Sequence, residues 1–351
     1  MQMYVNEMKK CIELAKNAVG ETSPNPLVGC VVLDKNGKEI ATGYHKKYGE
    51  FHAERDALNK LENAKDCTLI VNLEPCCHYG KTPPCTDIII EKGIKRVVYG
   101  MKDPNPLVAG KGLKILKDAG IEVTGPILED ECKKLNEIFI KNKTQNLPFV
   151  AIKTATTIDG KISTSNGDSK WITSQCARQR AKEFRSYYDA ILTSSSTILA
   201  DNPEMKHKTK IILDRELKTD INSKIYQDGI IYVFCAEPKT LKQNNITYIK
   251  TPVKNKKLDI KFVLKKAFEL GIMSIFVESG GILNGSILAY ADKLYHFTAP
   301  KILSDSSGKS CFDGNNKKEK ISQCIQLNHE KTEIYTPDIL NIYTINQSAI
   351  L

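Results

Sequence analysis

The sequence predicts an α/β protein of two domains, the first of them an α/β/α sandwich. In the first part of the chain, strand-like apolar runs alternate with amphipathic helices, which is the pattern of a sheet covered by helices on both faces. The length of 351 residues exceeds that of a typical single domain. A polar stretch without periodicity, residues 142–148, ends in proline and divides the chain. We therefore expect domains over residues 1–145 and 146–351.

The first elements follow from apolar spacing. Apolar residues at helical intervals predict a helix over residues 3–19, and a continuous apolar run predicts a strand over residues 27–33. Between them, the prolines of residues 22–26 predict a rigid loop. This loop holds Asn25 at the entrance of the strand, where its amide either binds a polar substrate or closes an Asx turn.

The segment from His52 to Cys85 carries the residue types of a catalytic zinc site. His52 and Glu54 open a predicted helix, and Cys76 and Cys85 come after an apolar strand over residues 69–73. One imidazole and two thiolates hold zinc tetrahedrally and leave its fourth position to water. Glu54 is placed to take a proton from that water and to pass it to a departing amine, as in zinc deaminases.

Two other interpretations apply to these cysteines. Isolated cysteines are most often buried apolar residues, and a structural zinc site would need a fourth Cys or His. Cys77 and His78 are the two candidates for such a ligand. We favour Cys76, directly after Pro75, as the ligand, with Cys77 and His78 beside the metal or facing the substrate.

Alternating elements continue to the end of the first domain. The pattern predicts strands over residues 95–100 and 120–123 and helices over residues 110–119 and 129–141. Residues 101–106 contain two prolines and form a loop at a strand's end. Asp103 and Asn105 in this loop are candidate substrate contacts.

In the second domain, predicted strands run into polar turns. A strand over residues 149–153 leads into small hydroxyl residues, and a strand over residues 189–193 leads into a Ser- and Thr-rich helix start that suits phosphate. A third strand, over residues 274–278, precedes Gly280 and Gly281, which either approach a pyrophosphate or form a simple tight turn. No Gly-x-Gly-x-x-Gly is present, so any nucleotide cofactor is expected in a fold other than the Rossmann fold.

The distribution of charge indicates which class of partner the protein binds, and its cysteines indicate the cellular compartment. Residues 1–147 carry 22 basic against 20 acidic side chains, so the zinc-bearing half lacks the basic excess of a nucleic-acid-binding protein. The basic excess lies in the second half, where it suits anionic small molecules. The sequence has no apolar run of membrane-spanning length and no signal-peptide pattern at its start, and its eleven cysteines are mostly scattered. We expect a cytoplasmic protein with reduced thiols and no membrane contact.

The sequence resembles the bifunctional deaminase and reductase family of riboflavin biosynthesis over nearly its whole length. The spacing of Cys76 and Cys85 is the most discriminating feature, because nucleoside and transfer-RNA deaminases usually carry Pro-Cys-x-x-Cys. The matching motifs are Pro24-Asn25-Pro26, His52-Ala53-Glu54, Glu74-Pro75-Cys76, Gly80-Lys81-Thr82-Pro83-Pro84-Cys85, Asp103-Pro104-Asn105-Pro106, Asp159-Gly160, Trp171-Ile172-Thr173-Ser174, Leu199-Ala200-Asp201 and Val277-Glu278 with Gly280.

This resemblance implies a cytidine deaminase-like α/β/α sandwich followed by a dihydrofolate reductase-like α/β domain. The first would use Zn²⁺ to remove the 2-amino group of 2,5-diamino-6-(5-phosphoribosylamino)pyrimidin-4(3H)-one by hydrolysis. The second would use NADPH to reduce the ribosyl group, which gives 5-amino-6-(5-phosphoribitylamino)uracil. The partner is thus a small phosphorylated pyrimidine and no nucleic acid, and the family suggests a homo-oligomer, a dimer or tetramer.

The resemblance also implies the contacts, by position. Lys208 stands where the family usually has arginine, and Gly281 stands where it commonly has proline. The cofactor contacts fall on Thr156, Trp171, Thr197, Asp201, Gly280, Gly281, Ile282, Leu283, Asn284, Gly285 and Ser286. The substrate contacts fall on Asn25, Lys81, Thr82, Asp103 and Asn105 in the deaminase and on Ser169, Arg185, Met205, Lys208 and Glu278 in the reductase. Lys153 is a further candidate substrate contact, near the centre of hydride transfer.

Two other classes of function remain as alternatives. One is a nucleic-acid or nucleoside base deaminase with an appended binding domain, which would need a basic, aromatic-lined channel beside the zinc. The other is a binding module that zinc merely stabilises, for which Glu54 would have no purpose.

Overall fold

The computed structural model describes residues 3–80, 82–106, 108–239, 245–314 and 318–346. The chain forms two compact units, Met1–Asn146 and Leu147–Leu351. This division falls one residue after the expected boundary.

The first unit is built on a five-stranded sheet with the order β2-β1-β3-β4-β5. The central pair β3 and β4 is parallel, as is β4 with β5, whereas β1 runs antiparallel to both β2 and β3. Every residue of β1 and β3 is buried, because helices cover the sheet on both faces. The strands are β1 (Gly29–Leu33), β2 (Glu39–Tyr44), β3 (Thr68–Leu73), β4 (Arg96–Met101) and β5 (Glu122–Thr124).

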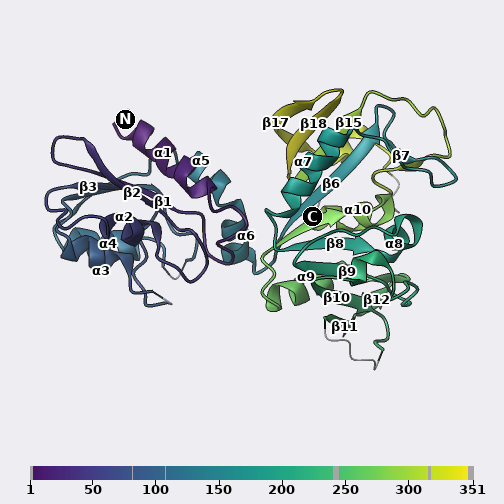
Figure 1. Ribbon diagram of the computed structural model, residues 1–351, viewed down its shortest axis with the longest axis horizontal. Coiled ribbons are helices and arrows are strands. Elements are labelled where there is room, and N and C mark those ends of the chain that lie inside the picture. Colours follow the sequence, from purple (N-terminus) through teal and green to yellow (C-terminus); the bar gives the residue numbers. More distant parts are fainter. Residues whose placement is uncertain (1–2, 81, 107, 240–244, 315–317, 347–351) are drawn as a thin grey trace. The chain divides into compact units, whose positions relative to one another are not determined.

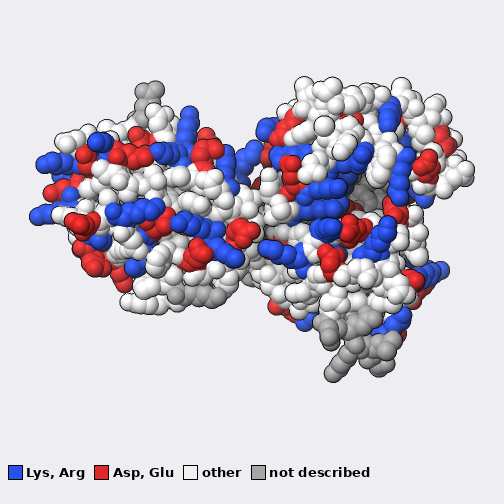
Figure 2. Space-filling model, in the orientation of Figure 1, with Lys and Arg blue, Asp and Glu red and all other residues white. Residues whose placement is uncertain are grey.

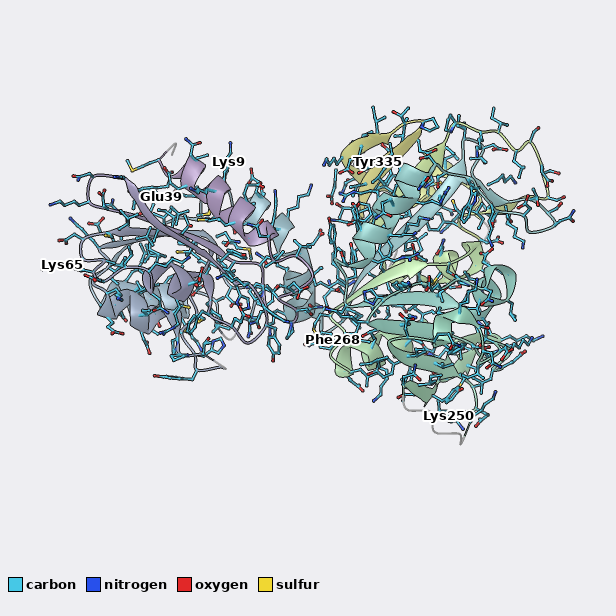
Figure 3. All side chains as sticks on the ribbon, viewed as in Figure 1. Lys9, Glu39, Lys65, Lys250, Phe268 and Tyr335 are labelled. Atoms are coloured by element: carbon cyan, nitrogen blue, oxygen red, sulfur yellow. The ribbon has the colours of Figure 1, made fainter. Side chains whose placement is uncertain are left out.

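Helices α1 (Val5–Lys16) and α5 (Glu129–Leu135) lie on one face of this sheet (Figure 1). Helices α2 (Ala53–Leu58), α3 (Cys85–Glu91) and α4 (Lys111–Asp118) lie on the other. The expected α/β/α sandwich is therefore confirmed. Exposed charged side chains such as Lys9, Glu39 and Lys65 cover its outside (Figure 3).

The end of this unit differs from the expectation. The single helix predicted over residues 129–141 is two helices, α5 and α6 (Glu137–Gln145), and α6 extends into the stretch expected to be an irregular linker. The break falls at Asn136, which leaves the helical conformation. Its buried side chain binds the backbone of Leu27, accepting from the N–H at 2.8 Å and donating to the carbonyl at 3.0 Å. This long-range pair explains why local periodicity did not reveal the break.

The second unit contains a nine-stranded sheet with the order β11-β10-β9-β8-β14-β6-β15-β18-β17. Neighbours from β11 to β15 are parallel, and β18 and β17 add an antiparallel hairpin at one edge. The strands are β6 (Phe149–Thr157), β8 (Ala190–Ser194), β9 (Thr209–Leu213), β10 (Ile230–Cys235), β11 (Ile246–Lys250), β14 (Ser274–Glu278), β15 (Lys293–Ala299), β17 (Leu327–Tyr335) and β18 (Asp338–Ile345). Short strands pair outside this sheet: β7 (Lys161–Ser163) with β16 (Lys309–Ser310), and β12 (Val253–Lys254) with β13 (Lys257–Leu258).

The helices of the second unit begin where their sequences supply caps. The Ser174 side chain accepts a hydrogen bond from Ala177 N–H at the start of α7, and Asp259 accepts one from Phe262 N–H at the start of α9. The helices are α7 (Gln175–Arg185), α8 (Ser195–Asp201), α9 (Ile260–Glu269) and α10 (Gly281–Ile287), with 3₁₀ turns η1 (Lys224–Tyr226), η2 (Leu288–Tyr290) and η3 (Ile321–Gln323).

The carboxyl ends of β8, β14 and β6 lie side by side in this sheet. Helix α8 follows β8, and α10 follows β14 after a short turn. Ligands of open parallel sheets bind at such an edge, where neighbouring connections diverge. Among the described residues, no helix combines the length and apolar character that crossing a membrane requires.

Candidate metal centre and reductase site

The residues of the expected zinc site come from three elements of the first unit. His52 is the N-cap of α2, so its ring stands at the helix start and Glu54 falls in the first turn. Cys76 follows β3, and Cys85 is the first residue of α3. Two helix starts and the end of a buried strand therefore bring together side chains that are up to 33 residues apart in the sequence.

The three side chains fit a zinc ion. The ligand atoms of His52, Cys76 and Cys85 lie within 4.8 Å of one another, and no second group of this kind occurs among the described residues. His52 Nδ1 lies 3.4 Å from Cys76 Sγ and 3.5 Å from Cys85 Sγ. Tetrahedral zinc with ordinary Zn–S and Zn–N lengths separates a nitrogen from a sulfur ligand by about 3.6 Å. Cys77 and His78 are not members of the group.

The pKa values of the two cysteines, Cys76 and Cys85, shift in opposite directions. A hydrogen bond from the Cys85 thiol, and then the contact with His52, lowers the pKa of Cys76. The same hydrogen bond raises the pKa of Cys85, and the Cys85 backbone N–H also donates to Cys76 Sγ at 3.3 Å. Cys76 is therefore the sulfur that this environment favours as a thiolate, the form that binds metals.

Glu54 is buried beside these sulfurs, with 3% of its surface exposed. Burial, and then the negative charge of Cys76, raises the pKa of this carboxyl to about 7. Its side chain forms a hydrogen bond with Cys85. A carboxyl that is not a member of the ligand group but touches it has the position expected of a proton carrier.

Asn25 lies at this site together with a residue that the sequence analysis did not select, His45. His45 Nδ1 donates to the Phe51 carbonyl at 2.9 Å, so that Nε2 is free to accept from the Asn25 amide at 3.1 Å. The His45 ring is buried and stands edge-on to the His52 ring at 5.3 Å between centroids. Its position seven residues before His52, in the same connection between β2 and α2, was the only sequence signal for it.

The remaining deaminase candidates lie around the same side chains. Thr82 Oγ1 is 3.5 Å from His52 Nε2, whereas Lys81 falls outside the described residues. Asp103 accepts from Asn105 N–H at 2.8 Å, which closes an Asx turn, and the Asp103 N–H donates to Glu74, two residues before Cys76, at 3.1 Å. The expected loop thus stands beside the segment that leads to Cys76.

Three substrate candidates of the second unit form one cluster. Arg185, the last residue of α7, donates to Glu278 Oε2 through Nε at 2.9 Å and through Nη2 at 2.7 Å. Lys153 pairs in register with Glu278, where β6 continues past the end of β14. Burial lowers the pKa of Lys153, while the charge of Glu278 opposes this change. The cluster combines two cations with one carboxylate at the carboxyl edge of the sheet.

Hydroxyl groups gather next to this cluster. Ser194 Oγ lies 2.9 Å from Ser279 Oγ and 3.3 Å from Thr197 Oγ1, so the ends of β8 and β14 present adjacent hydroxyls. Ser169 donates to Asp201 at 3.4 Å, which joins a substrate candidate to a cofactor candidate. Such hydroxyls at helix starts are typical phosphate contacts.

Trp171 lies on the surface with 61% of its area exposed. Its ring stacks on the Arg178 guanidinium, 4.2 Å from the ring centroid, and its carbonyl accepts from Lys301 Nζ at 2.7 Å. Met205 is buried and Lys208 is exposed, and both precede β9. The ring and the two residues before β9 therefore come from different parts of the unit.

The residues expected to hold the nicotinamide cofactor leave polar atoms without a protein partner. Among the described residues, Thr156 Oγ1 and Asn284 Oδ1 are buried and make no hydrogen bond. A side-chain carbon at Gly280 would meet no atom within 4 Å, so the turn before α10 faces open space. Within α10, Ile282 is exposed and Leu283 is buried. Gly285 packs closely against the Asp313 backbone, and the Ser286 hydroxyl donates to the Ile282 carbonyl. Orphaned polar atoms beside open backbone fit a polar cofactor.

Comparison with known proteins defines the class. A model of the cytidine and deoxycytidylate deaminase zinc-binding region matches residues 1–101, and a model of the RibD C-terminal domain matches residues 148–341. The molecule is thus a zinc-dependent deaminase followed by a reductase. One alternative was a base deaminase with an appended binding domain. The second half of the chain instead matches a reductase domain.

The chain belongs to the RibD family of bifunctional riboflavin biosynthesis enzymes. It is 39% identical to the riboflavin biosynthesis protein RibD of Actinobacillus pleuropneumoniae over 96% of this chain and 94% of the relative, and 34% identical to that of Escherichia coli over 95% and 96%. A solved deaminase and reductase from Thermotoga maritima is 37% identical, with a TM-score of 0.89 over 98% of this chain and 99% of the other. RibD of Acinetobacter baumannii gives a TM-score of 0.88 at 33% identity, covering 97% and 98%. The expected family, the α/β architecture of both domains, both activities and the use of Zn²⁺ and NADPH are confirmed.

Proposed function

We propose that His52, Cys76 and Cys85 bind the zinc ion of the deaminase and that Glu54 is its general acid and base. The convergence of the three ligand atoms within 4.8 Å, with the buried Glu54 carboxyl against Cys85, carries this proposal. A zinc ion bound there polarises water and makes it a nucleophile at neutral pH. Glu54 takes the proton that this water loses and delivers it to the departing ammonia.

The substrate-facing side chains then orient the pyrimidine. We assign its polar edges to Asn25, whose amide His45 fixes, and to Asp103 and Asn105 in the loop that Glu74 holds. Lys81 and Thr82 complete the set on the segment between the two cysteines.

In the reductase, we assign the substrate contacts to Lys153, Ser169, Arg185, Met205, Lys208 and Glu278. NADPH, when bound, supplies the hydride that reduces the ribosyl carbon. Lys153 and Arg185 bring positive charge to a site for a phosphorylated substrate, and Glu278 fixes the Arg185 guanidinium by accepting from two of its nitrogens. The cofactor contacts are Thr156, Trp171, Thr197, Asp201 and the residues from Gly280 to Ser286, where buried polar atoms lack partners.

Replacement of Glu54 by glutamine tests the deaminase assignment. The amide keeps the shape of the side chain but cannot carry the proton, so ammonia release should fall roughly 10²- to 10⁴-fold. Zinc content and NADPH oxidation with the deaminated intermediate should not change. Glu50→Gln, an exposed carboxylate four residues earlier, is the matched control. Ammonia release that survives in Glu54→Gln would refute the assignment.

We further propose that the protein acts on free small molecules in the cytoplasm. Acidic and basic side chains are interspersed on the face of the first unit in Figure 2, which supports a partner other than a nucleic-acid backbone. The cysteines are free thiols in the structure, as a reducing compartment requires. Inhibition of ammonia release by single-stranded DNA or RNA at physiological salt would argue against this proposal.

We also propose a homo-oligomer, a dimer or tetramer. Strand β17 is at the edge of the nine-stranded sheet, and Ile334 on it is 74% exposed. Edge strands with exposed apolar side chains favour pairing with another chain. Sedimentation velocity at micromolar concentration should give at least a dimer, and a monomer would contradict the proposal.

A further inference from the structure

Two segments carry Arg185, Met205 and Lys208, three of the substrate contacts that the reductase assignment proposes. Arg185 ends helix α7, and Met205 and Lys208 belong to the connection between α8 and β9. These segments are 20 residues or more apart in sequence, and Lys208 is exposed. The distance between the Arg185 and Lys208 charges therefore depends on what fastens the connection to the helix.

The side chain of His207 joins the two segments. Its Nε2 lies 3.1 Å from the carbonyl oxygen of Arg185 and 3.0 Å from that of Tyr188. Because carbonyl oxygens only accept, Nε2 carries a proton and donates to both. The Arg185 carbonyl belongs to the last turn of α7, where helical carbonyls need partners from outside the helix, and the Tyr188 carbonyl follows it three residues later. His207 thus supplies a cap that comes from the neighbouring connection.

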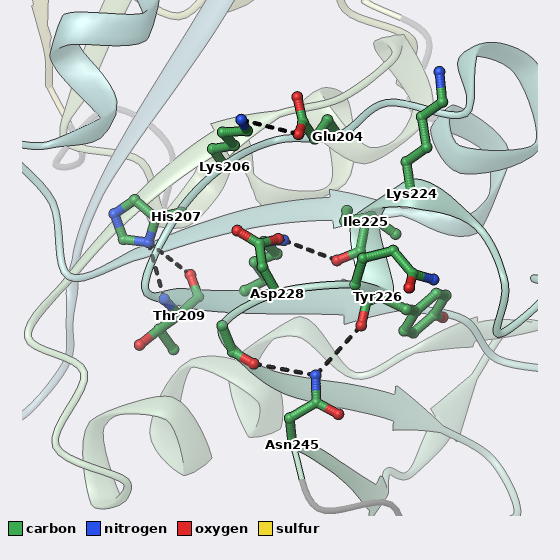
Figure 4. Close-up of polar contacts among 12 residues, drawn as sticks. Glu204, Lys206, His207, Thr209, Lys224, Ile225, Tyr226, Asp228 and Asn245 are labelled. Atoms are coloured by element: carbon green, nitrogen blue, oxygen red, sulfur yellow. Dashed lines mark hydrogen bonds and ion pairs between the residues drawn. The ribbon is translucent and has the colours of Figure 1, made fainter.

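The other ring nitrogen holds the connection itself. His207 Nδ1 lies 3.1 Å from Thr209 N and 2.8 Å from the Thr209 carbonyl oxygen, and Figure 4 shows the ring turned onto the Thr209 backbone. Ring and backbone therefore close a small loop around Lys208. The geometry fixes the direction in which the Lys208 side chain leaves the chain.

Strand β10 fastens the same connection from its other side. Ile230 N–H donates to the Lys208 carbonyl at 2.8 Å. Gly229 lies so close that a side-chain carbon there would come within 2.5 Å of the His207 carbonyl oxygen. The connection is thus held against β10 by its backbone, and His207 ties it to α7. The guanidinium of Arg185 is in turn held by Glu278.

We propose that His207 is a positioning residue of the reductase, which sets the spacing between Lys208 and Arg185 so that both reach the 5′-phosphate of the substrate. The proposal rests on the assignment of Lys208 and Arg185 as substrate contacts. His207 itself does not touch the reacting atoms. Its loss therefore weakens substrate binding and leaves the hydride step and the deaminase as they were.

His207→Ala in the full-length protein tests this role. The KM for the deaminated phosphoribosyl substrate should rise about tenfold, since two hydrogen bonds of ordinary net strength are lost. The kcat of NADPH oxidation, the KM for NADPH and ammonia release should stay within about twofold. With the same substrate lacking its 5′-phosphate, wild type and variant should have equal KM values. General damage to the unit would instead raise KM for both substrates.

Three further variants complete the test. His207→Gln keeps a donor for the α7 carbonyls and should recover part of the lost affinity. Lys206→Ala, an exposed neighbour whose side chain pairs with Glu204, is the matched control and should resemble wild type. Lys208→Ala distinguishes a failure of the positioning role from a failure of the phosphate assignment. If it raises KM and His207→Ala does not, the positioning role is wrong, and if neither raises KM, the proposed phosphate contacts are wrong as well.

Discussion

At the residue scale, the environment distinguishes two neighbouring cysteines as zinc ligands. Cys76 and Cys77 are adjacent in sequence, yet the environment favours the thiolate only at Cys76, where Cys85 and His52 contact it. Burial instead raises the pKa of the Cys77 thiol. Cys76 is therefore favoured as a thiolate that binds a cation, whereas Cys77 is favoured as a neutral thiol.

This difference predicts how serine replacements affect zinc. Cys76→Ser and Cys85→Ser should each bind zinc at least tenfold more weakly, because each removes a ligand from the metal. Cys77→Ser should retain one zinc ion per chain. Metal analysis of the purified, dialysed variants distinguishes these results. A zinc-free Cys77→Ser protein beside a zinc-loaded Cys76→Ser protein would reverse the assignment.

At this scale the sequence was informative where chemistry requires a fixed motif. His52, Glu54 and the two cysteines could be selected because only certain residue types at certain spacings suit catalytic zinc. His45 could not, because its position beside Asn25 and His52 results from how the connection between β2 and α2 folds back. His207 was equally hidden, since its partners are backbone carbonyls at the end of a separate helix and just after it.

At the scale of elements, one carboxylate joins the zinc strand to the substrate loop. Glu74, one residue after β3, accepts hydrogen bonds from the backbone N–H groups of Asp103 at 3.1 Å, Gly110 at 2.9 Å and Gly112 at 3.0 Å. Both of its oxygens are used, and the side chain is buried. It fixes the start of α4 and the loop before it relative to the segment that continues to Cys76.

Glu74→Gln should therefore destabilise the first unit. Whichever way the amide is turned, its NH₂ group faces backbone N–H donors, which leaves buried donors unsatisfied at a cost of about 3 kcal/mol. The urea concentration at which the unit releases its zinc should fall by about 1–2 M. Glu91→Gln, an exposed carboxylate on α3, is the control. Zinc release at the wild-type urea concentration would contradict this role for Glu74.

Element prediction succeeded for buried strands and failed where tertiary contacts decide. The fully buried runs of β1 and β3 were recognised from their apolar sequences. The break at Asn136 was missed because its cause is a hydrogen bond to Leu27, 109 residues away. Strand β17 has mostly exposed residues, and such an edge strand lacks the alternation that identifies a strand in sequence.

At the scale of the whole molecule, the two chemistries belong to separate compact units. The only tryptophan, Trp171, lies in the second unit, so its fluorescence reports on the unfolding of that unit alone. The expected boundary was close because a polar, proline-ended stretch falls at the division. A dihydrofolate reductase-like α/β domain was expected only through family resemblance, because strands far apart in sequence pair within its nine-stranded sheet.

The most direct test of the account is removal and return of zinc. After treatment with a chelator, the full-length protein should release no ammonia from the diamino substrate, yet it should oxidise NADPH with the deaminated intermediate at the original rate. Addition of one equivalent of Zn²⁺ should restore ammonia release. Ammonia release from the zinc-free protein, or loss of NADPH oxidation together with the metal, would contradict a zinc deaminase in the first unit beside an independent reductase in the second.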